Sequence, residues 1–345
     1  MKKQNVLALA LKPAMRVTES VGISTMLMLT AALIAMITPS AVSASSPCHA
    51  PIATRLVTGL QGAMGSTIGP DGALYVTEGA IGTISRVDPQ TGEKTTFASG
   101  LPPAIIGIGG AIDVAFIDNT AYVLVTLVND PLFPSSNVDG IYRVDGPDSF
   151  TVVADIGAFN LANPPTIQFP YFIATGLQYA LQTYRGGFLV ADSHLNRVLR
   201  VTLDGEISVL IPFDNIVPTG LAVRGNTVYM AEAGPDPHLP QNGKVVSFGA
   251  RSPTATEVAS DVPFLLDVEF GGGSLYALSH GTVDPNIDPS NAVAYTGALV
   301  KINEDGTFTH IVDGLDRPTS LEFIGNTAYV VTLTGEIWKI EAVSK

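Results

Sequence analysis

The chain has 345 residues, including 34 glycines and 24 prolines, and only 14% of its residues are charged. Its formal net charge of −13 repels phosphate backbones and anionic lipid surfaces, so nucleic-acid binding is excluded as a working function. Abundant glycine and proline with few charges are typical of many short strands joined by tight turns.

The first 44 residues have the features of a signal peptide. Four lysine and arginine residues in positions 2–16 precede an uncharged apolar run from 21 to 37, and small residues then lead to Ala44. This order predicts secretion with cleavage after Ala44. An uncleaved anchor is the alternative, although a spanning helix needs roughly 20 apolar residues and this run is shorter. We therefore expect a periplasmic or extracellular protein with no stable membrane insertion after cleavage.

Residues 45–53 are expected to form a flexible tail that contains Cys48, the only cysteine of the chain. A single cysteine allows no internal disulfide. Pro47 directly before it does not fit a lipidation motif, so we expect a free thiol, which in an oxidising compartment could pair with another chain. Residues 45–345 carry 14 basic and 30 acidic residues.

One unit recurs along the rest of the chain. Its second strand contains a tyrosine-like anchor and occurs as "ALYVTE" (73–78), "AYVLVT" (121–126), "GFLVAD" (187–192), "VYMAEA" (228–233), "LYALSH" (275–280) and "AYVVTL" (328–333). A third strand follows each of these, and apolar and polar residues alternate in most of them, which is the pattern of half-buried strands. Most anchors are 40 to 53 residues apart, the length of a four-stranded propeller blade.

Five of the six units end in a fourth strand, and the sixth lacks one because the chain stops soon after its third. "TRLVTGL" (54–60) closely matches the fourth strand "THIVDGL" (309–315), although no foldable unit precedes it. The N-terminal strand can therefore complete the last blade, which removes an unpaired sheet edge. We predict an all-β fold in which residues 54–345 form one six-bladed β-propeller with four-stranded blades.

The repeats resemble known propellers. "PTGLAVRGNTVYMAEAG" and "GGFLVADSHLNRVLRVTLDGE" are similar to NHL-type blades. In order along the chain, "RLVTGL", "IGPDGALYVTEG", "GTISRVDPQTGE" and "GAIDVAF" resemble the ScyD/ScyE family, named for two proteins of the scytonemin pigment cluster. The similarity extends from about Thr54 to Glu341 and implies a secreted propeller without established catalytic residues. Wider six-bladed relatives include calcium-dependent lactonases of the gluconolactonase group, by analogy of fold only.

Long inserts should lie on one face of the propeller, because loops between second and third strands share a face with the links between blades. They fall at 127–140, 155–176, 233–243 and 280–297. Ordering long loops is costly in entropy, so they favour a binding role, although drift in surface loops would explain them equally well. Six aromatic residues in them could line a cleft or merely pack the link: Phe133, Phe159, Phe169, Tyr171, Phe172 and Tyr295.

Two carboxylates are expected at the axis. Aligning the start of the first strands places these residues in one slot: Gly65, Asp113, Gly176, Gly220, Asp267 and Ser320. Asp113 and Asp267 belong to blades 2 and 5, which are opposite in a ring of six. At the channel mouth they could hold a cation, or each could only accept backbone N–H bonds at a strand start.

A second ring should end the second strands: Glu78, Val125, Asp192, Glu232, Ser279 and Thr332. Three histidines, His194, His238 and His280, follow in blades 3, 4 and 5. Carboxylates suit Ca²⁺ and imidazoles suit transition metals, while solvated loop residues are the alternative. "DPNIDPSN" (284–291) lacks the glycine and distal glutamate of an EF-hand loop, so it is weak as a calcium loop.

Two functions remain open, and the sequence does not decide whether the protein is an enzyme. The first is a secreted binding propeller that needs no cofactor and holds a small molecule, a glycan or a protein over blades 2–5. Its expected ligand-binding residues are Asp113, Asp267, Asp192, Glu232, His194, His280, Phe169, Tyr171 and Phe172. The second is a lactonase-type hydrolase in which Asp113 and Asp267 hold Ca²⁺, with Asp192, Glu232 or His280 as a further ligand or base.

Overall fold

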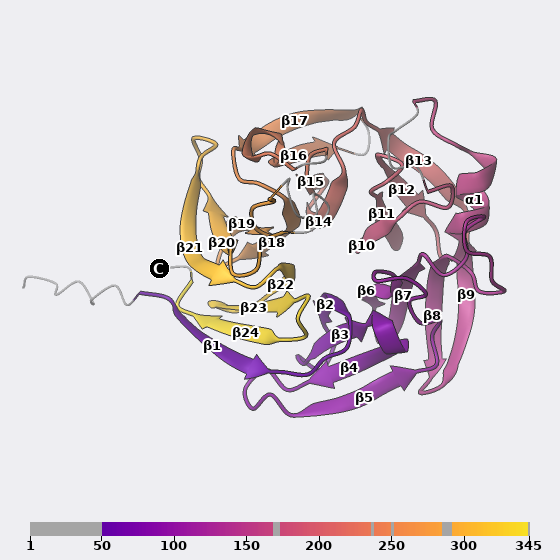
Figure 1. Ribbon diagram of the computed structural model, residues 1–345, viewed down its shortest axis with the longest axis horizontal. Helices are drawn as coiled ribbons and strands as arrows, with labels where there is room; N and C mark the ends of the chain where they lie inside the picture. Colours follow the sequence, from indigo (N-terminus) through magenta and orange to yellow (C-terminus); the bar gives the residue numbers. More distant parts are fainter. Residues whose placement is uncertain (1–49, 168–172, 236–237, 250–251, 285–291, 344–345) are drawn as a thin grey trace, which may run out of the picture. The chain divides into compact units, whose positions relative to one another are not determined.

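Twenty-four strands in the described part of the chain form six antiparallel sheets of four strands, arranged in a ring (Figure 1). The computed structural model describes residues 50–167, 173–235, 238–249, 252–284 and 292–343, which belong to one unit, Cys48–Lys345. The prediction of a six-bladed, four-stranded β-propeller is confirmed.

The first three blades follow the chain in order, from the innermost to the outermost strand. Blade 1 contains β2 (Ala63–Ile68), β3 (Leu74–Glu78), β4 (Thr83–Val87) and β5 (Lys94–Ser99). Blade 2 contains β6 (Gly110–Ile117), β7 (Thr120–Thr126), β8 (Gly140–Gly146) and β9 (Ser149–Asp155). Blade 3 contains β10 (Gln178–Tyr184), β11 (Gly187–Asp192), β12 (Arg197–Val201) and β13 (Ile207–Pro212).

The other three blades repeat this order, except that the last takes its outer strand from the N-terminus. Blade 4 contains β14 (Pro218–Arg224), β15 (Thr227–Glu232), β16 (Lys244–Gly249) and β17 (Ser252–Ser260). Blade 5 contains β18 (Leu265–Gly271), β19 (Ser274–Ser279), β20 (Gly297–Ile302) and β21 (Phe308–Leu315). Blade 6 contains β22 (Pro318–Ile324), β23 (Thr327–Thr332), β24 (Ile337–Glu341) and β1 (Ile52–Val57).

The two ends of the chain close the ring. β1 pairs antiparallel with β24, with Thr54 opposite Lys339 and Val57 opposite Ile337, and the two strands lie side by side in Figure 1. The Leu60 N–H continues the pairing with a hydrogen bond to the Gly335 carbonyl (3.1 Å). Closure by the N-terminal strand is confirmed, and the strand begins two residues before Thr54.

The recurrent tyrosines join five of the six blades to the next, which explains their place in the repeat. Tyr75 of blade 1 packs edge-on against Phe116 of blade 2, with ring centroids 4.8 Å apart. Equivalent contacts link blades 2 and 3, 4 and 5, and 5 and 6. The Tyr329 hydroxyl of blade 6 donates to the Pro89 carbonyl of blade 1 (3.1 Å). Large aromatic area and a polar tip suit this position between two sheets.

Two other elements lie on the connections. Helix α1 (Ile156–Ala162) forms part of the link into blade 3, and Asp155 caps it by accepting a hydrogen bond from the Ala158 N–H (2.8 Å). Short 3₁₀ turns follow β3 and precede β16. No helix among the described residues is long and apolar enough to cross a membrane.

Candidate functional site

The loop-rich face of the ring is the end at which the innermost strands begin and the second strands finish. Each of the six second-strand ends pairs with the first strand of its own blade: Glu78, Val125, Asp192, Glu232, Ser279 and Thr332 pair with Ala63, Ala111, Gln178, Pro218, Leu265 and Pro318. The register thus places this predicted ring at one level of the propeller.

The axial slot two residues further along the innermost strands agrees with the predicted alignment in five blades and differs in blade 3. There the slot is occupied by Ala180, which pairs with Ala191 as Asp113 pairs with Leu124. Gly176 lies before β10 with φ of 78°. The error arose because Thr-Gly-Leu occurs in both blades, inside the strand at Gly220 and in the preceding turn at Gly176.

Asp113 joins the innermost strands of blades 2 and 3. Its Oδ1 accepts a hydrogen bond from the Val114 N–H (2.8 Å), and its Oδ2 accepts one from the Leu181 N–H (2.7 Å). Burial raises the pKa of Asp113 well above its usual range, and the charge of Asp267 adds to this. The carboxylate therefore acts as a backbone acceptor, the structural role that the sequence left open.

Asp267 repeats this arrangement between blades 5 and 6. Its Oδ1 accepts from the Val268 N–H (2.8 Å) and its Oδ2 from the Leu321 N–H (2.7 Å). A Cβ atom on Gly220 would lie 2.5 Å from Asp267 Oδ1, and one on Gly65 would lie 2.3 Å from Asp113 Oδ1. Each aspartate thus needs a glycine in the preceding blade, because no side chain fits beside its carboxylate.

Tyr179 lies across the channel above the two aspartates. Its side chain starts in β10 of blade 3, and its hydroxyl donates a hydrogen bond to the Thr319 carbonyl in blade 6, the opposite blade (3.2 Å). Burial, followed by the charges of Asp267 and Asp113, raises the pKa of Tyr179. The Tyr179 side chain thus spans the channel from blade 3 to blade 6 close to both aspartates, and the expectation that they open onto the channel mouth stays a prediction.

A cavity of about 240 Å³ lies along the axis on the other side of the aspartates. Four carboxylates line it, and no lysine or arginine is among its lining residues: Asp113, Asp267, Glu269 and Glu322. Burial raises the pKa of Asp267 to about 7 and that of Glu269 to about 8. Burial and the charge of Glu269 also raise the pKa of Glu322. The four groups cannot all be ionised at neutral pH without a nearby positive charge.

The sequence interpretation missed the second pair of these acids, Glu269 and Glu322. They pair with Tyr276 and Tyr329, two of the recurrent tyrosines, and stand two residues after the axial slot. Strand residues two apart face the same side, so the pattern Asp-Val-Glu at 267–269 contained the signal. Glu269 Oε1 accepts from the Phe270 N–H (2.7 Å), whereas no hydrogen bond to Glu322 is found among the described residues.

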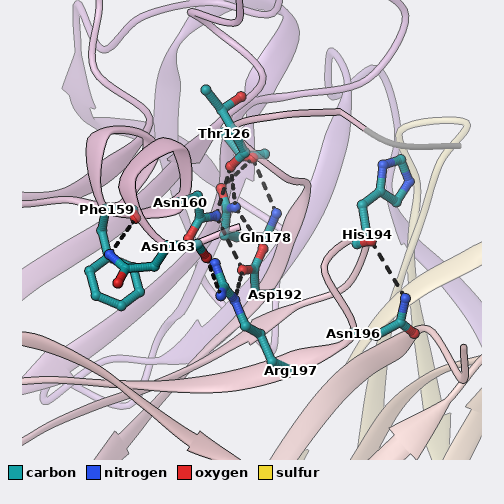
Figure 2. A network of polar contacts seen from close by, with 10 residues as sticks. Thr126, Phe159, Asn160, Asn163, Gln178, Asp192, His194, Asn196 and Arg197 are labelled. Carbon is teal, nitrogen blue, oxygen red and sulfur yellow. Dashed lines mark hydrogen bonds and ion pairs between the residues drawn. The ribbon is translucent and has the colours of Figure 1, made fainter. Parts of the chain in front are cut away.

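Asp192 is the centre of a buried polar network and is fully enclosed (Figure 2). Arg197 Nε donates to Asp192 Oδ2 (2.9 Å), and Gln178 Nε2 donates to Asp192 Oδ1 (2.9 Å). Asn160 of α1 donates to Oδ2 (3.1 Å) and accepts from Arg197 (2.7 Å). The network attaches the link into blade 3 to its sheet, so the structure gives Asp192 a positioning role rather than an exposed one.

Glu232 occupies the equivalent position in blade 4 with far fewer partners. It is 5% exposed, and no hydrogen bond to its carboxylate is found among the described residues. Burial raises its pKa to about 7, because the favourable charge of Lys244 does not offset desolvation. Lys244 instead pairs with Glu257 at 2.6 Å. The Glu232 carboxyl can thus gain or lose its proton near neutral pH.

Two of the three predicted histidines contact Phe264 on the loop-rich face. The His238 ring stacks on Phe264 with centroids 4.0 Å apart, and His280 meets the same ring edge-on at 4.9 Å. His280 Nδ1 donates to the Pro318 carbonyl (3.0 Å), while His194 Nδ1 is enclosed without a hydrogen-bond partner. Burial lowers the pKa of His194 and of His280 to about 4, with the charge of His238 contributing to both shifts. The two imidazoles are therefore neutral at pH 7.

The predicted aromatic cleft is only partly within the described structure. Phe169, Tyr171 and Phe172 lie outside the described residues, so this part of the prediction stays untested. Phe159 packs against the hydrophobic core, with the Arg197 guanidinium 5.7 Å from its ring centre. Tyr295 is 70% exposed. The described aromatics thus divide into packing residues and one exposed ring.

Exposed large hydrophobic side chains are concentrated on this face. We call those on its loops and links the apolar rim: Ile81, Ile105, Ile106, Leu132, Leu161, Ile167, Leu239, Val293 and Tyr295. The other exposed members of this class are Leu203 in a hairpin at the opposite end and three residues in outer strands. Burial of apolar surface is the main source of affinity in docking, so the rim distinguishes one end of the ring.

The described residues contain no group of three or more histidine, cysteine, aspartate or glutamate side chains placed to hold a metal ion. Asp113 and Asp267 stand in opposite blades, and each is already engaged by backbone N–H groups. Binding of Ca²⁺ at this pair stays a prediction.

No family model matches the chain, and no curated protein matches its sequence. The resemblance to the ScyD/ScyE family accordingly stays a prediction. Solved six-bladed propellers match its fold. The chain is similar to virginiamycin B lyase from Staphylococcus aureus at 14% identity, with a TM-score of 0.52, over 84% of this chain and 98% of that one.

Two further solved structures show the same likeness. A gluconolactonase from Xanthomonas campestris has 11% identity and a TM-score of 0.57, over 84% of this chain and 89% of its own. An aldose sugar dehydrogenase from Streptomyces coelicolor, solved with PQQ bound, has 16% identity and a TM-score of 0.54, over 86% and 99%. At such low identity these comparisons support the fold alone.

Proposed function

We propose that this propeller is an exported binding protein of the ScyD/ScyE type whose loop-rich face docks a partner with an apolar surface, either another protein or a small molecule. The apolar rim is the observation that supports it most. Exposed apolar groups gathered on one face mark binding surfaces. Aliphatic side chains form most of the rim, which suits an apolar partner better than a glycan.

Introduction of a charge on the rim, with a matched change at the other end of the ring, tests this proposal. Leu132→Lys and Tyr295→Lys each place a charge on the rim, whereas Leu203→Lys places one in the hairpin between β12 and β13. Ligands would first be identified with the wild type by thermal shift, using a panel of aromatic and aliphatic small molecules, and by cross-linking in culture supernatant. We expect at least about tenfold weaker binding in the rim variants and unchanged binding in Leu203→Lys. Equal effects in all three variants would refute the assignment to this face.

Export has its own test. Expression of the full chain in a bacterial host, followed by mass spectrometry of the fraction outside the cytoplasm, should give a protein that begins at Ser45. A protein that keeps residues 1–44 and pellets with membranes would favour the uncleaved anchor instead.

A metal-assisted hydrolase or related enzyme is the second candidate. The acidic axial cavity favours it, because Asp113 and Asp267 stand in opposite blades and Glu269 adds a carboxyl whose pKa is close to neutral. Solved structures of similar fold include proteins described as a gluconolactonase and as a virginiamycin B lyase, which supports this candidate by analogy of fold only. A cation between the aspartates would polarise a substrate carbonyl, and Glu269 would accept or return a proton.

Lactone hydrolysis distinguishes this candidate from the first. Wild type, Asp113→Asn and Asp267→Asn would be assayed against a panel of sugar and aliphatic lactones with Ca²⁺, Mg²⁺, Mn²⁺ or EDTA. Metal-dependent turnover that both variants lose would support the enzyme. Absence of turnover under every condition, together with rim-dependent binding, would leave the binding function alone.

A further inference from the structure

The insertion between β7 and β8 contains two buried aspartates that no part of the axial site uses. Asp130 and Asp139 lie near its two ends, and each is 1% exposed. They are close enough for the charge of Asp130 to disfavour ionisation of Asp139, and no basic side chain is among the groups that act on Asp139. Two ionised carboxylates that are buried together, without a basic side chain beside them, destabilise the folded state unless a cation binds between them.

Hydrogen bonds account for three of the four carboxylate oxygens. Asp139 Oδ1 accepts from the Val128 N–H (2.7 Å), and Asp130 Oδ1 accepts from the Leu132 N–H (2.9 Å). Asp130 Oδ2 accepts from both the N–H and the hydroxyl of Thr175, at 3.0 and 3.1 Å. These bonds fasten the insertion of blade 2 to the start of blade 3.

The fourth oxygen, Asp139 Oδ2, is completely enclosed and has no hydrogen-bond partner. Buried carboxylate oxygens are almost always satisfied, so this one requires either a proton of its own or a bound ligand. The Thr175 side chain, which holds Asp130, also acts on the Asp139 carboxyl, so both acids meet at this threonine. Gly157 packs against both residues, since a Cβ there would lie 3.2 Å from Asp139 Cβ and 3.6 Å from Thr175 Cγ2.

We propose that Asp130 and Asp139 bind a hard divalent cation of the Ca²⁺ type, which locks the 127–140 insertion onto the link into blade 3. All donors at this place are oxygens, and carboxylate oxygens are the ligands that Ca²⁺ prefers. Two acidic side chains supply only part of its coordination shell, so backbone carbonyls and water complete it. The site is distinct from the axial aspartates and stabilises the apolar rim, because Leu132 belongs to the same insertion.

Calcium-dependent melting of the full chain tests the proposal. Ca²⁺ at millimolar concentration should raise the Tm of the EDTA-treated wild type by about 3 °C or more, because a ligand of the native state stabilises it by mass action. Asp139→Asn should lose this shift. It should also melt at or above the EDTA-treated wild type, since the amide removes a buried charge beside Asp130. Asp113→Asn and Asp267→Asn are the matched controls and should keep the full shift.

Terbium luminescence gives a second readout that does not depend on stability. Tyr142 lies beside the site, with its hydroxyl donating to the Val138 carbonyl (2.9 Å) and its pKa raised by burial and then by the charge of Asp139. Tb³⁺ bound between the aspartates should therefore show emission sensitised by tyrosine, which Asp139→Asn abolishes. Tyr142→Phe should weaken the emission and keep the calcium shift.

Three results would overturn the proposal. The first is a wild type that shows neither the shift nor the emission, which would mean that Asp139 is simply protonated. The second is a shift that persists in Asp139→Asn. The third is a shift lost only in the axial variants, which would assign the cation to the channel and support the enzyme candidate instead.

Discussion

Blades 1–3 and blades 4–6 build the axis in the same way at one level and differently at the next. In each half a glycine, an aspartate and a leucine N–H from three consecutive blades form one unit: Gly65, Asp113 and Leu181 in the first, and Gly220, Asp267 and Leu321 in the second. The next level lies two residues after the axial slot of each innermost strand. There the first half has Thr67, Ala115 and Gln182, whereas the second has Ala222, Glu269 and Glu322.

This difference distinguishes the axial residues that have a structural role from those that are candidates for binding or catalysis. The unit shared by both halves satisfies backbone groups and has a structural explanation. The pair Glu269 and Glu322 has no counterpart in the other half, and its charges oppose each other in a cavity without basic lining residues. A feature that only one half carries is therefore the better candidate for binding or catalysis.

Alanine at either axial glycine should give the largest effect. Gly65→Ala and Gly220→Ala each force a Cβ atom to within 2.5 Å of an aspartate oxygen. We expect each to lower the free energy of unfolding by about 2–3 kcal/mol, measured by denaturant titration, with similar values in the two halves. A large loss in one half and none in the other would show that the two units are not equivalent.

Removal of the aspartates should follow. Asp113→Ala leaves the Leu181 N–H without its acceptor, and Asp267→Ala does the same to Leu321. A buried unsatisfied N–H costs about 1–3 kcal/mol, from which relief of the buried charge is subtracted. We expect a net loss of about 1 kcal/mol in both variants at pH 5. Unchanged stability of both would contradict the role as backbone acceptors.

The glutamate pair should make stability depend on pH in one direction. The folded pKa of Glu269 is about 8 against an ordinary value of 4.5, so the folded state binds more protons than the unfolded state between these values. The free energy of unfolding of the wild type should accordingly rise as the pH falls from 8.5 to 5. Glu269→Gln should flatten the curve by at least about 1 kcal/mol, while Gln182→Ala, its control in the other half, leaves the slope unchanged.

Coupling between the two glutamates should be the smallest measurable effect. A double-mutant cycle of Glu269→Gln and Glu322→Gln should give an interaction free energy of about 0.5–1 kcal/mol at pH 8.5, because the charge of Glu269 raises the pKa of Glu322. At pH 5 both are protonated and the coupling should vanish. Equal coupling at the two pH values would point to packing rather than charge.

Local pattern was sufficient for several parts of the fold. The recurrence of Tyr75, Tyr122, Tyr229, Tyr276 and Tyr329 predicted the blades, and the match of 54–60 to 309–315 predicted ring closure. Each depends on strand alternation and on repetition, which are properties of neighbouring residues. The opposition of Asp113 and Asp267 also followed, because a sixfold ring converts a difference of three repeats into a facing pair.

Other features depended on contacts that no local pattern encodes. Thr-Gly-Leu at 175–177 and at 219–221 has the same letters, yet one precedes its strand and the other lies within it. Whether Asp192 is satisfied and Glu232 is not depends on Arg197, Gln178 and Asn160, and Asn160 comes from the link before blade 3.

The sequence by itself determined the number of blades, their order and the closure of the ring, because short strands with period-two alternation can bury their apolar faces only against further copies of themselves. Only the tertiary structure decided which acids have their hydrogen bonds satisfied by the scaffold and which do not. Tyr179 of blade 3 reaches across the channel to the Thr319 carbonyl of blade 6, and the orphaned oxygen of Asp139 exists only where two distant segments meet. The protonation and ligands of a carboxyl depend on burial and on partners brought from other blades, and these are set when the ring closes.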